Sequence, residues 1–405
     1  STDHKRYKAK SLELLGKDEE AFETWKSIED LQEEDQLHLA STASRIGNLK
    51  AAIDAASAIP EDSDHYGKAL LILGKVFKRL GDREQAIHYL SKAVETEVDQ
   101  EEPWLALADL YAGNGEMDQS IETLRTAKSV FPESSEISYQ LARHLLSKDS
   151  PSEALIVLND LTNQHPDYLP GQVLTVKTMK ALNHEGIESK MNELVSRFPD
   201  SAEVNFLQGQ QYLDAGKLAE ARQLLGKAVS ANDPDPEWLV AYADALAGDP
   251  YEAAGQTKTW YPADQATALN ALKRSGYVEV DPLASAIQAE ILLSNQKAEE
   301  AYRLLSTVVS KQAVAENRWY WRLQAGFARA AAALGKFNVA LASIQEAISQ
   351  KPEMAGLYQV LANICSASGD TLAAVEAANQ VLTIAPDVVE NVLWFASFLT
   401  GLGHQ

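Results

Sequence analysis

The sequence predicts an all-α protein in which pairs of antiparallel helices follow one another along the chain. The first observation behind this prediction is self-similarity: small and apolar residues recur with a period of 34 residues over much of the 405-residue chain. The second is that glycine and proline return in phase with this period. Unrelated amphipathic helices would not keep glycine and proline in register, so we expect one helix–turn–helix unit per period.

The self-similarity is clearest between residues 67 and 132. Six positions in this stretch have a counterpart 34 residues further on. The pairs are Gly74 and Ala108, Phe77 and Tyr111, Gly81 and Gly115, Ala86 and Ser120, Leu90 and Leu124, and Ala93 and Ala127. We call this set of recurring positions the repeat grid. Each 34-residue interval of the grid predicts one pair of helices.

Each recurring position has a physical role in a helix pair. A small residue at the eighth position, such as Gly74, lets the two helices approach closely. A glycine at the fifteenth position, such as Gly81 or Gly115, supplies the left-handed conformation that stops the first helix. A proline near the end, such as Pro132, ends the second helix.

The grid also predicts where the units begin. The first helices should start near residues 2, 33, 67, 101, 135, 168, 202, 235, 282, 321, 355 and 389. Residues 1–248 should then hold seven to eight helix pairs, 249–281 an irregular unit or a hinge, and 282–405 three further pairs plus a single terminal helix. That last helix is apolar on more than one side, which favours an excerpt from a longer protein over a capping helix.

This pattern resembles the tetratricopeptide repeat (TPR) family, and Trp104, Leu107, Ala108 and Tyr111 match the opening of its motif best. The resemblance covers nearly the whole chain, and its specificity comes from many coincident positions. It implies a right-handed α-solenoid, a tetratricopeptide-like superhelix. It also implies a concave face lined by the first helix of each pair, at positions 2, 5, 6, 9, 12 and 13 of the unit.

The interval of 47 residues between the starts at 235 and 282 breaks the pattern. We expect a short second helix over about 250–260, an extra helix over 263–275 stopped by Gly276, and an extended, strand-like segment over 277–281. The break is either a hinge or a packed irregular unit. We favour the packed unit, because Trp260, Tyr261 and Tyr277 are costly to expose.

A run of aromatic residues enters the unit at 321. Trp319, Tyr320 and Trp321 cannot all face one side of a helix, and Arg318 and Arg322 flank them. One interpretation is that the run fills the seam left by the long preceding unit. The other is a partner-binding patch of Trp319, Tyr320, Trp321 and Arg322, because these residue types dominate binding hot spots.

Composition and motifs argue against several classes of function. The net charge of −22 argues against a nucleic-acid or anionic-membrane binder and favours basic partners. No P-loop, HExxH or nucleophile-elbow motif occurs, and the single Cys365 excludes a cysteine-based zinc site. We therefore expect no enzymatic activity, catalytic residues, cofactor or metal.

The resemblance implies that peptide binding falls to the concave positions. Carried over unit by unit, it gives the candidate peptide-binding residues Tyr139, Gln140, Arg143, Gln172, Val176, Phe206, Gln210 and Leu239. Replacing Phe206 should then weaken binding and leave folding nearly intact. Lys68, Lys75, Lys78 and Arg79 form a local basic patch on the same face.

The sequence thus favours a non-enzymatic scaffold that binds proteins or peptides in its concave groove. The alternative is the recognition arm of a larger enzyme or of a bacterial cell-envelope or secretion machine. No run of residues is apolar enough to insert into a membrane, and a soluble cytoplasmic protein is favoured, with the bacterial envelope as the alternative. The sequence does not predict the oligomeric state.

Overall fold

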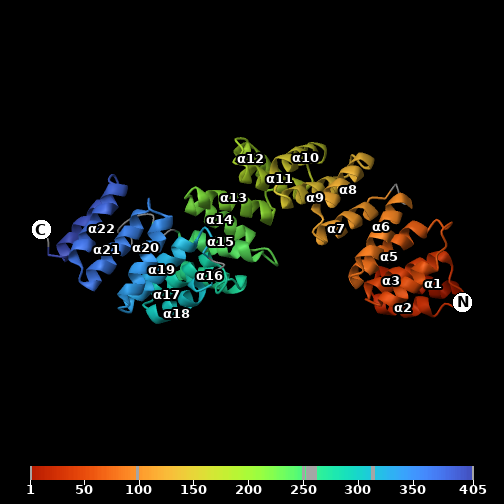
Figure 1. Ribbon diagram of the computed structural model, residues 1–405, viewed down its shortest axis with the longest axis horizontal. Helices are drawn as coiled ribbons and strands as arrows, with labels where there is room; N and C mark the ends of the chain where they lie inside the picture. The colour runs from red at the N-terminus through yellow and green to blue at the C-terminus, as the bar shows by residue number, and fades with distance from the viewer. Residues whose placement is uncertain (1, 97–99, 249–250, 252–261, 312–314, 404–405) are drawn as a thin grey trace. The chain divides into compact units, whose positions relative to one another are not determined.

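The computed structural model describes residues 2–96, 100–248, 251, 262–311 and 315–403, and every regular element in these residues is a helix (Figure 1). The chain divides into two compact units, residues 1–194 (unit 1) and 195–405 (unit 2). The predicted all-α fold of antiparallel helix pairs is confirmed.

Unit 1 contains six first helices and the second helices that follow them. They are α1 (Thr2–Leu14), α2 (Asp18–Lys26), α3 (Glu33–Arg45), α4 (Leu49–Ser57), α5 (Tyr66–Leu80), α6 (Arg83–Thr96), α7 (Glu102–Gly113), α8 (Met117–Val130), α9 (Ser135–Ser147), α10 (Pro151–Gln164), α11 (Leu169–Ala181) and α12 (Ile187–Arg197). The last three residues of α12 fall beyond the division at residue 194.

Unit 2 continues the same alternation and finishes with an unpaired first helix. Its helices are α13 (Ala202–Asp214), α14 (Leu218–Ala228), α15 (Pro236–Ala247), α16 (Pro262–Ser275), α17 (Pro282–Ser294), α18 (Ala298–Val309), α19 (Tyr320–Ala333), α20 (Phe337–Gln350), α21 (Ala355–Ser368), α22 (Thr371–Ile384) and α23 (Val389–Gly401).

The predicted unit starts are confirmed to within one residue. For example, α5 begins at Tyr66, α9 at Ser135, α17 at Pro282 and α23 at Val389. Local sequence sets these boundaries. Asp281 accepts a hydrogen bond from the backbone N–H of Ala284 as the N-cap of α17, and the following Pro282 suits the first turn because it has no N–H to leave unpaired.

The turn between the two helices of a pair has the left-handed conformation that glycine at the fifteenth position of the unit predicts. Gly81 and Gly115 have φ of 76° and 80°. Where the repeat lacks this glycine, Asp149, Asn183 and Gln296 adopt φ between 48° and 59°. The turn geometry is therefore retained where the chain has no glycine, at a small conformational cost.

The small residues of the grid hold the two helices of a pair together. A Cβ on Gly74 would lie 2.5 Å from Leu90 Cγ, so the absent side chain makes room for the neighbouring helix. The matching second-helix positions are fully buried, among them Ala86, Leu90, Ala154, Leu158, Ala221, Leu225, Ala340 and Ile344. The core is thus a series of apolar layers between successive helices, as expected for a stacked repeat.

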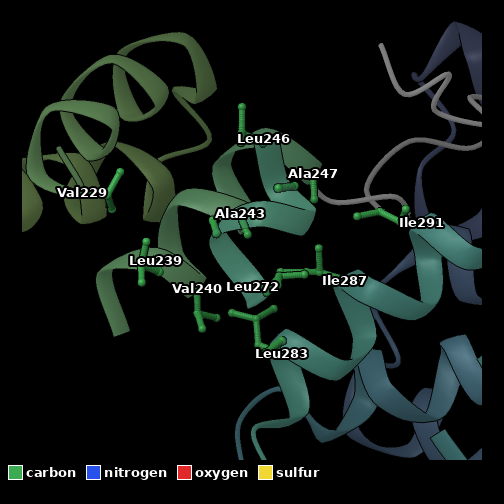
Figure 2. Close-up of a cluster of buried hydrophobic side chains, with 13 residues drawn as sticks. Val229, Leu239, Val240, Ala243, Leu246, Ala247, Leu272, Leu283, Ile287 and Ile291 are labelled. Carbon is green, nitrogen blue, oxygen red and sulfur yellow. The ribbon is translucent and has the colours of Figure 1, made fainter. Parts of the chain in front are cut away.

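The long unit after residue 235 is organised differently from the prediction. The helix at 263–275 exists as α16, but it packs on α15 as the second helix of that pair rather than as an additional element. Figure 2 shows Leu239 and Val240 of α15, Leu272 of α16 and Ile287 of α17 in one apolar cluster. The short helix expected over 250–260 lies outside the described residues, apart from Tyr251, which is not helical.

The expected strand-like segment over 277–281 is a turn. The backbone N–H groups of Val280 and Asp281 both donate to the carbonyl oxygen of Tyr277, at 3.0 and 2.8 Å. The alternating pattern was misleading because only a few residues connect α16 to the N-cap of α17, which favours a tight turn. The chain's organisation into residues 1–248, 249–281 and 282–405 stays a prediction.

Candidate functional site

The first helices α3, α5, α7 and α9 of unit 1 line a groove. It consists of two hollows of about 410 and 370 Å³, and Lys75 and Glu102 contribute to both. The first hollow is lined by Leu37, His38, Ser41, Ser44, Arg45, Gly67, Lys68, Leu71, Ile72, Lys75, Gln100, Glu102 and Pro103. The second is lined by Lys75, Lys78, Leu90, Glu102, Leu105, Ala106, Ala108, Asp109, Leu124, Glu136, Gln140, Arg143 and His144.

The groove has an apolar floor that the repeat core holds in place. Leu71 belongs to the buried cluster between α5 and α7, and Ile72 packs against the neighbouring cluster between α3 and α5. Leu37 and Leu105 extend the floor on α3 and α7. Because these side chains come from successive repeats, the floor runs along the stacking direction and suits a chain laid across several helices.

Ion pairs cross the groove from one repeat to the next. Lys75 pairs with Glu102 and Lys78 pairs with Asp109, and both pairs join α5 to α7. The side chains of Lys75 and Glu102 are 44% and 65% exposed. Such exposed pairs contribute only about 0–1 kcal/mol each, so an incoming charged group can replace one partner at little cost.

Beyond these pairs, the groove carries more positive than negative groups. Lys68 and Arg143 add to Lys75 and Lys78, as does Arg45, which pairs with Asp18 at 2.9 Å, whereas the acids of the lining are Glu102, Asp109 and Glu136. The whole chain carries a net charge of −22. Charges more than about 8 Å apart are largely screened at physiological ionic strength, so a ligand in the groove experiences these local cations more than the distant acids.

A buried hydrogen bond fixes His144 at one end of the groove. Ser120 Oγ donates to the carbonyl oxygen of Ala108 at 2.6 Å and lies 2.7 Å from His144 Nδ1. The single hydroxyl proton is therefore used, and Nδ1 must carry the proton that it donates to Ser120. Burial, with the adjacent Arg143 charge, lowers the pKa of His144, so the ring is neutral at neutral pH.

His38 is held in a similar way at the other end. Glu13 accepts hydrogen bonds from Trp25 Nε1 at 2.8 Å and Thr42 Oγ1 at 2.7 Å, and its other oxygen lies 3.0 Å from His38 Nδ1. Burial raises the pKa of Glu13, but these hydrogen bonds outweigh burial and leave the pKa below its ordinary value. The His38 ring also stacks on Trp25, so α1, α2 and α3 together position it.

Of the peptide-binding residues predicted from the sequence, Gln140 and Arg143 line this groove. The Arg143 guanidinium lies 5.9 Å from the centre of the Tyr139 ring, which is half-buried against Tyr168. The groove is also lined by four residues that were not predicted from the sequence: Leu37, Leu71, Ile72 and Leu105. They occupy positions 5 and 6 of their units, so the same grid applied to the units at 33, 67 and 101 would have found them.

Four other residues predicted from the sequence are buried in the structure and do not line the groove of unit 1. Gln172 donates to the carbonyl oxygen of Pro166 at 2.9 Å, Val176 is 2% exposed, and Leu239 lies in the cluster of Figure 2. Phe206 stacks on Trp238 with ring centres 5.4 Å apart in a buried cluster. Replacing Phe206 therefore cannot leave folding intact. Gln210 is half-buried and donates to Asp214, and peptide binding by it stays a prediction.

The proposed partner patch of Trp319, Tyr320, Trp321 and Arg322 is corrected in part. Trp321 and Arg322 are 3% and 1% exposed, so other parts of the chain cover both side chains in this structure. Arg322 donates to both oxygens of Glu290 and to Asp244 Oδ1, at 2.7–2.9 Å. Trp319 and Tyr320 are half-buried. The run mainly fills the interior between α15, α17 and α19, as the first interpretation predicted.

The described residues contain no cluster of three or more His, Cys, Asp or Glu that could hold a metal ion. Within the same residues, none of the helices is both long and apolar enough to cross a membrane.

Comparison with known proteins gives one curated relative and several solved structures of similar fold. The TPR repeat-containing protein YpiA of Bacillus subtilis (strain 168) is 26% identical over 145 residues, which cover 35% of this chain and 34% of the relative. The chain thus matches about a third of the length of that relative.

Two solved structures illustrate the similarity. The C-terminal part of a TPR repeat-containing protein from Cytophaga hutchinsonii is 12% identical with a TM-score of 0.47, over 58% of this chain and 98% of that one. Yeast Tom70 is 11% identical with a TM-score of 0.37, over 99% of this chain and 96% of that one.

The family model described as tetratricopeptide repeat matches residues 71–128, 105–168, 190–257 and 326–388. These regions together cover more than half of the chain. They include α7, α9 and most of α5 in the groove, and the pairs α13–α14 and α21–α22 of unit 2 in full. The chain therefore belongs to the tetratricopeptide repeat family.

Proposed function

We propose that this protein is a non-enzymatic scaffold that binds a segment of a protein partner in the groove of α3, α5, α7 and α9. The observation that supports this most is the combination of an apolar floor, made by Leu37, Leu71 and Leu105, with an ionic rim. An extended or helical segment gains affinity by burying apolar side chains on the floor, and the rim selects it by charge.

The local charge favours an acidic segment over a basic one. Lys68 and Arg143 are exposed and line different hollows of the groove, on α5 and α9. Acidic side chains of a partner can pair with both, and they can also replace Glu102 or Asp109 on Lys75 and Lys78. This reverses the preference for basic partners that the net charge alone indicates, because the nearest charges dominate in salt.

A charge-reversal experiment tests the proposal. The probe is a fluorescein-labelled peptide of glutamate and leucine, and its twin has lysine at every glutamate position. Fluorescence polarisation should show that the glutamate peptide binds at least about tenfold more tightly than its twin. The double variant Lys68→Glu with Arg143→Glu should lose at least about tenfold of that affinity.

The matched control is Lys8→Glu with Lys50→Glu, which makes the same change in net charge at two exposed lysines outside the groove. It should bind the glutamate peptide nearly as the unaltered protein does. Equal binding by the groove variant and the control would contradict the proposal, and so would a preference for the lysine peptide.

A further inference from the structure

The concave positions of α19 are buried, whereas the equivalent positions of α5 are open. Arg322 and Ala325, at positions 2 and 5 of their unit, are 1% and 0% exposed. Lys68 at position 2 of α5 is exposed, and Leu71 at position 5 lines the groove. A first helix that is buried on this face must be covered by another part of the protein.

Part of this cover is Tyr251, which precedes α19 in sequence by about two repeats. Its side chain is 1% exposed and meets Trp321 edge to face, with ring centres 5.8 Å apart and planes at 74°. The Arg329 guanidinium lies 6.0 Å from the centre of the same ring. Trp321 and Arg329 thus form an aromatic and cationic pocket around one tyrosine.

The backbone near Tyr251 is bound as well. The Gly356 N–H, at the start of α21, donates to the carbonyl oxygen of Tyr251 at 3.2 Å. Arg322 Nη2 donates to the carbonyl oxygen of Gly248 at 3.0 Å. Two carbonyl groups three residues apart therefore accept hydrogen bonds from two different repeats, as the main chain of a bound peptide does.

Gly356 is the residue that permits this backbone contact. A Cβ at this position would lie 2.2 Å from the Tyr251 carbonyl oxygen and 2.7 Å from its carbonyl carbon. Backbone atoms cannot rotate away as a flexible side chain can. The contact of the Tyr251 backbone with α21 therefore requires a residue without a side chain at position 2 of the α21 unit.

We infer that the concave face of α19 and the N-terminal turn of α21 form a second peptide-binding site, which recognises a tyrosine side chain and its backbone carbonyl group and is filled in cis by the chain's own Tyr251. The site is made by Trp321, Arg322, Arg329 and Gly356. It belongs to unit 2 and does not depend on the proposed role of the groove in unit 1.

Occupancy in cis has a quantitative consequence. A ligand tethered by a short stretch of chain acts at an effective concentration of the order of millimolar. A free peptide with the same residues must compete with it, and its apparent affinity falls in proportion to the fraction of molecules whose site is open. Emptying the site should therefore reveal binding that the unaltered protein hides.

The test uses a labelled peptide with the sequence of residues 246–254 and a twin with alanine in place of the tyrosine. The variant Tyr251→Ala should bind the tyrosine peptide at least about tenfold more tightly than the unaltered protein. It should not bind the alanine twin. Adding Gly356→Ala to Tyr251→Ala should abolish binding, because the new Cβ occupies the place of the tyrosine carbonyl group.

Failure of folded Tyr251→Ala to bind the tyrosine peptide would overturn the inference, as would equal binding by the unaltered protein. If Tyr251→Ala does not fold, the single variant Gly356→Ala tests the inference instead. It should expel Tyr251, so nitration of Tyr251 by tetranitromethane should rise relative to nitration of Tyr277, which is 39% exposed. Unchanged nitration of Tyr251 would overturn the inference.

Discussion

Replacing Arg322 by methionine should lower the free energy of unfolding of the region around α15, α17 and α19 by about 3–5 kcal/mol. Arg322 satisfies Glu290 through two hydrogen bonds and Asp244 through a third, and all three side chains are at most 7% exposed. Methionine fills a similar volume but removes the three hydrogen bonds and the positive charge that Arg322 gives to two buried carboxylates. Urea denaturation followed by far-ultraviolet circular dichroism measures the loss.

The control for this prediction is Arg125→Met. Arg125 pairs with Glu153 at 2.7 Å, but the two side chains are 51% and 57% exposed. Water can replace the lost partner there, so the cost should stay below about 1 kcal/mol. A triple variant with Arg322→Met, Glu290→Leu and Asp244→Leu should recover much of the stability, because no buried charge is left. Equal effects of Arg322→Met and Arg125→Met would contradict the buried network.

Phe206→Ala should destabilise unit 2 by about 3–5 kcal/mol. The Phe206 ring is 7% exposed, stacks on Trp238 and packs with Ala221, Leu225 and Ala241 between α13, α14 and α15. Removing it leaves a cavity that rigid helices fill only in part. The same urea experiment measures the loss, and tryptophan emission should shift because Trp238 loses the ring stacked on it.

Gln210→Ala on the same helix serves as the control. Gln210 is half-buried, and its side-chain amide donates to Asp214, one turn away on α13. Its replacement should change stability by no more than about 0.5 kcal/mol. A Phe206→Ala protein as stable as Gln210→Ala would return Phe206 to the accessible groove position that the family pattern implies.

The helix boundaries were largely predictable because they depend on local chemistry. Glycine in the left-handed conformation, as at Gly81, and proline in a first turn, as at Pro282, act on the backbone of their own segment. Because the period of the repeat is nearly constant, one helix boundary predicts the position of the next. The turn at Tyr277 was missed because a two-residue alternation is too short to separate a strand from a connection set by its flanking helices.

The candidate site was less predictable because the repeat pattern indicates which way a side chain faces, but not what covers it. Phe206 and Leu239 occupy concave positions, yet aromatic and aliphatic residues of the next repeat bury them. Arg322 also occupies such a position, yet Glu290 and Gly248 enclose it. These contacts join residues far apart in sequence, and no local signal encodes them.

The groove of α3, α5, α7 and α9 is tested most directly by finding where a bound peptide lies. The photoreactive residue p-benzoylphenylalanine is placed at Ile72, on the groove floor, or at Ile156, which is 67% exposed on α10 and outside the groove lining. The labelled glutamate–leucine peptide is added, and the products are read on a denaturing gel after irradiation. A covalent adduct is expected at position 72 and none at position 156. An adduct of equal yield at position 156, or none at position 72, would contradict peptide binding in this groove.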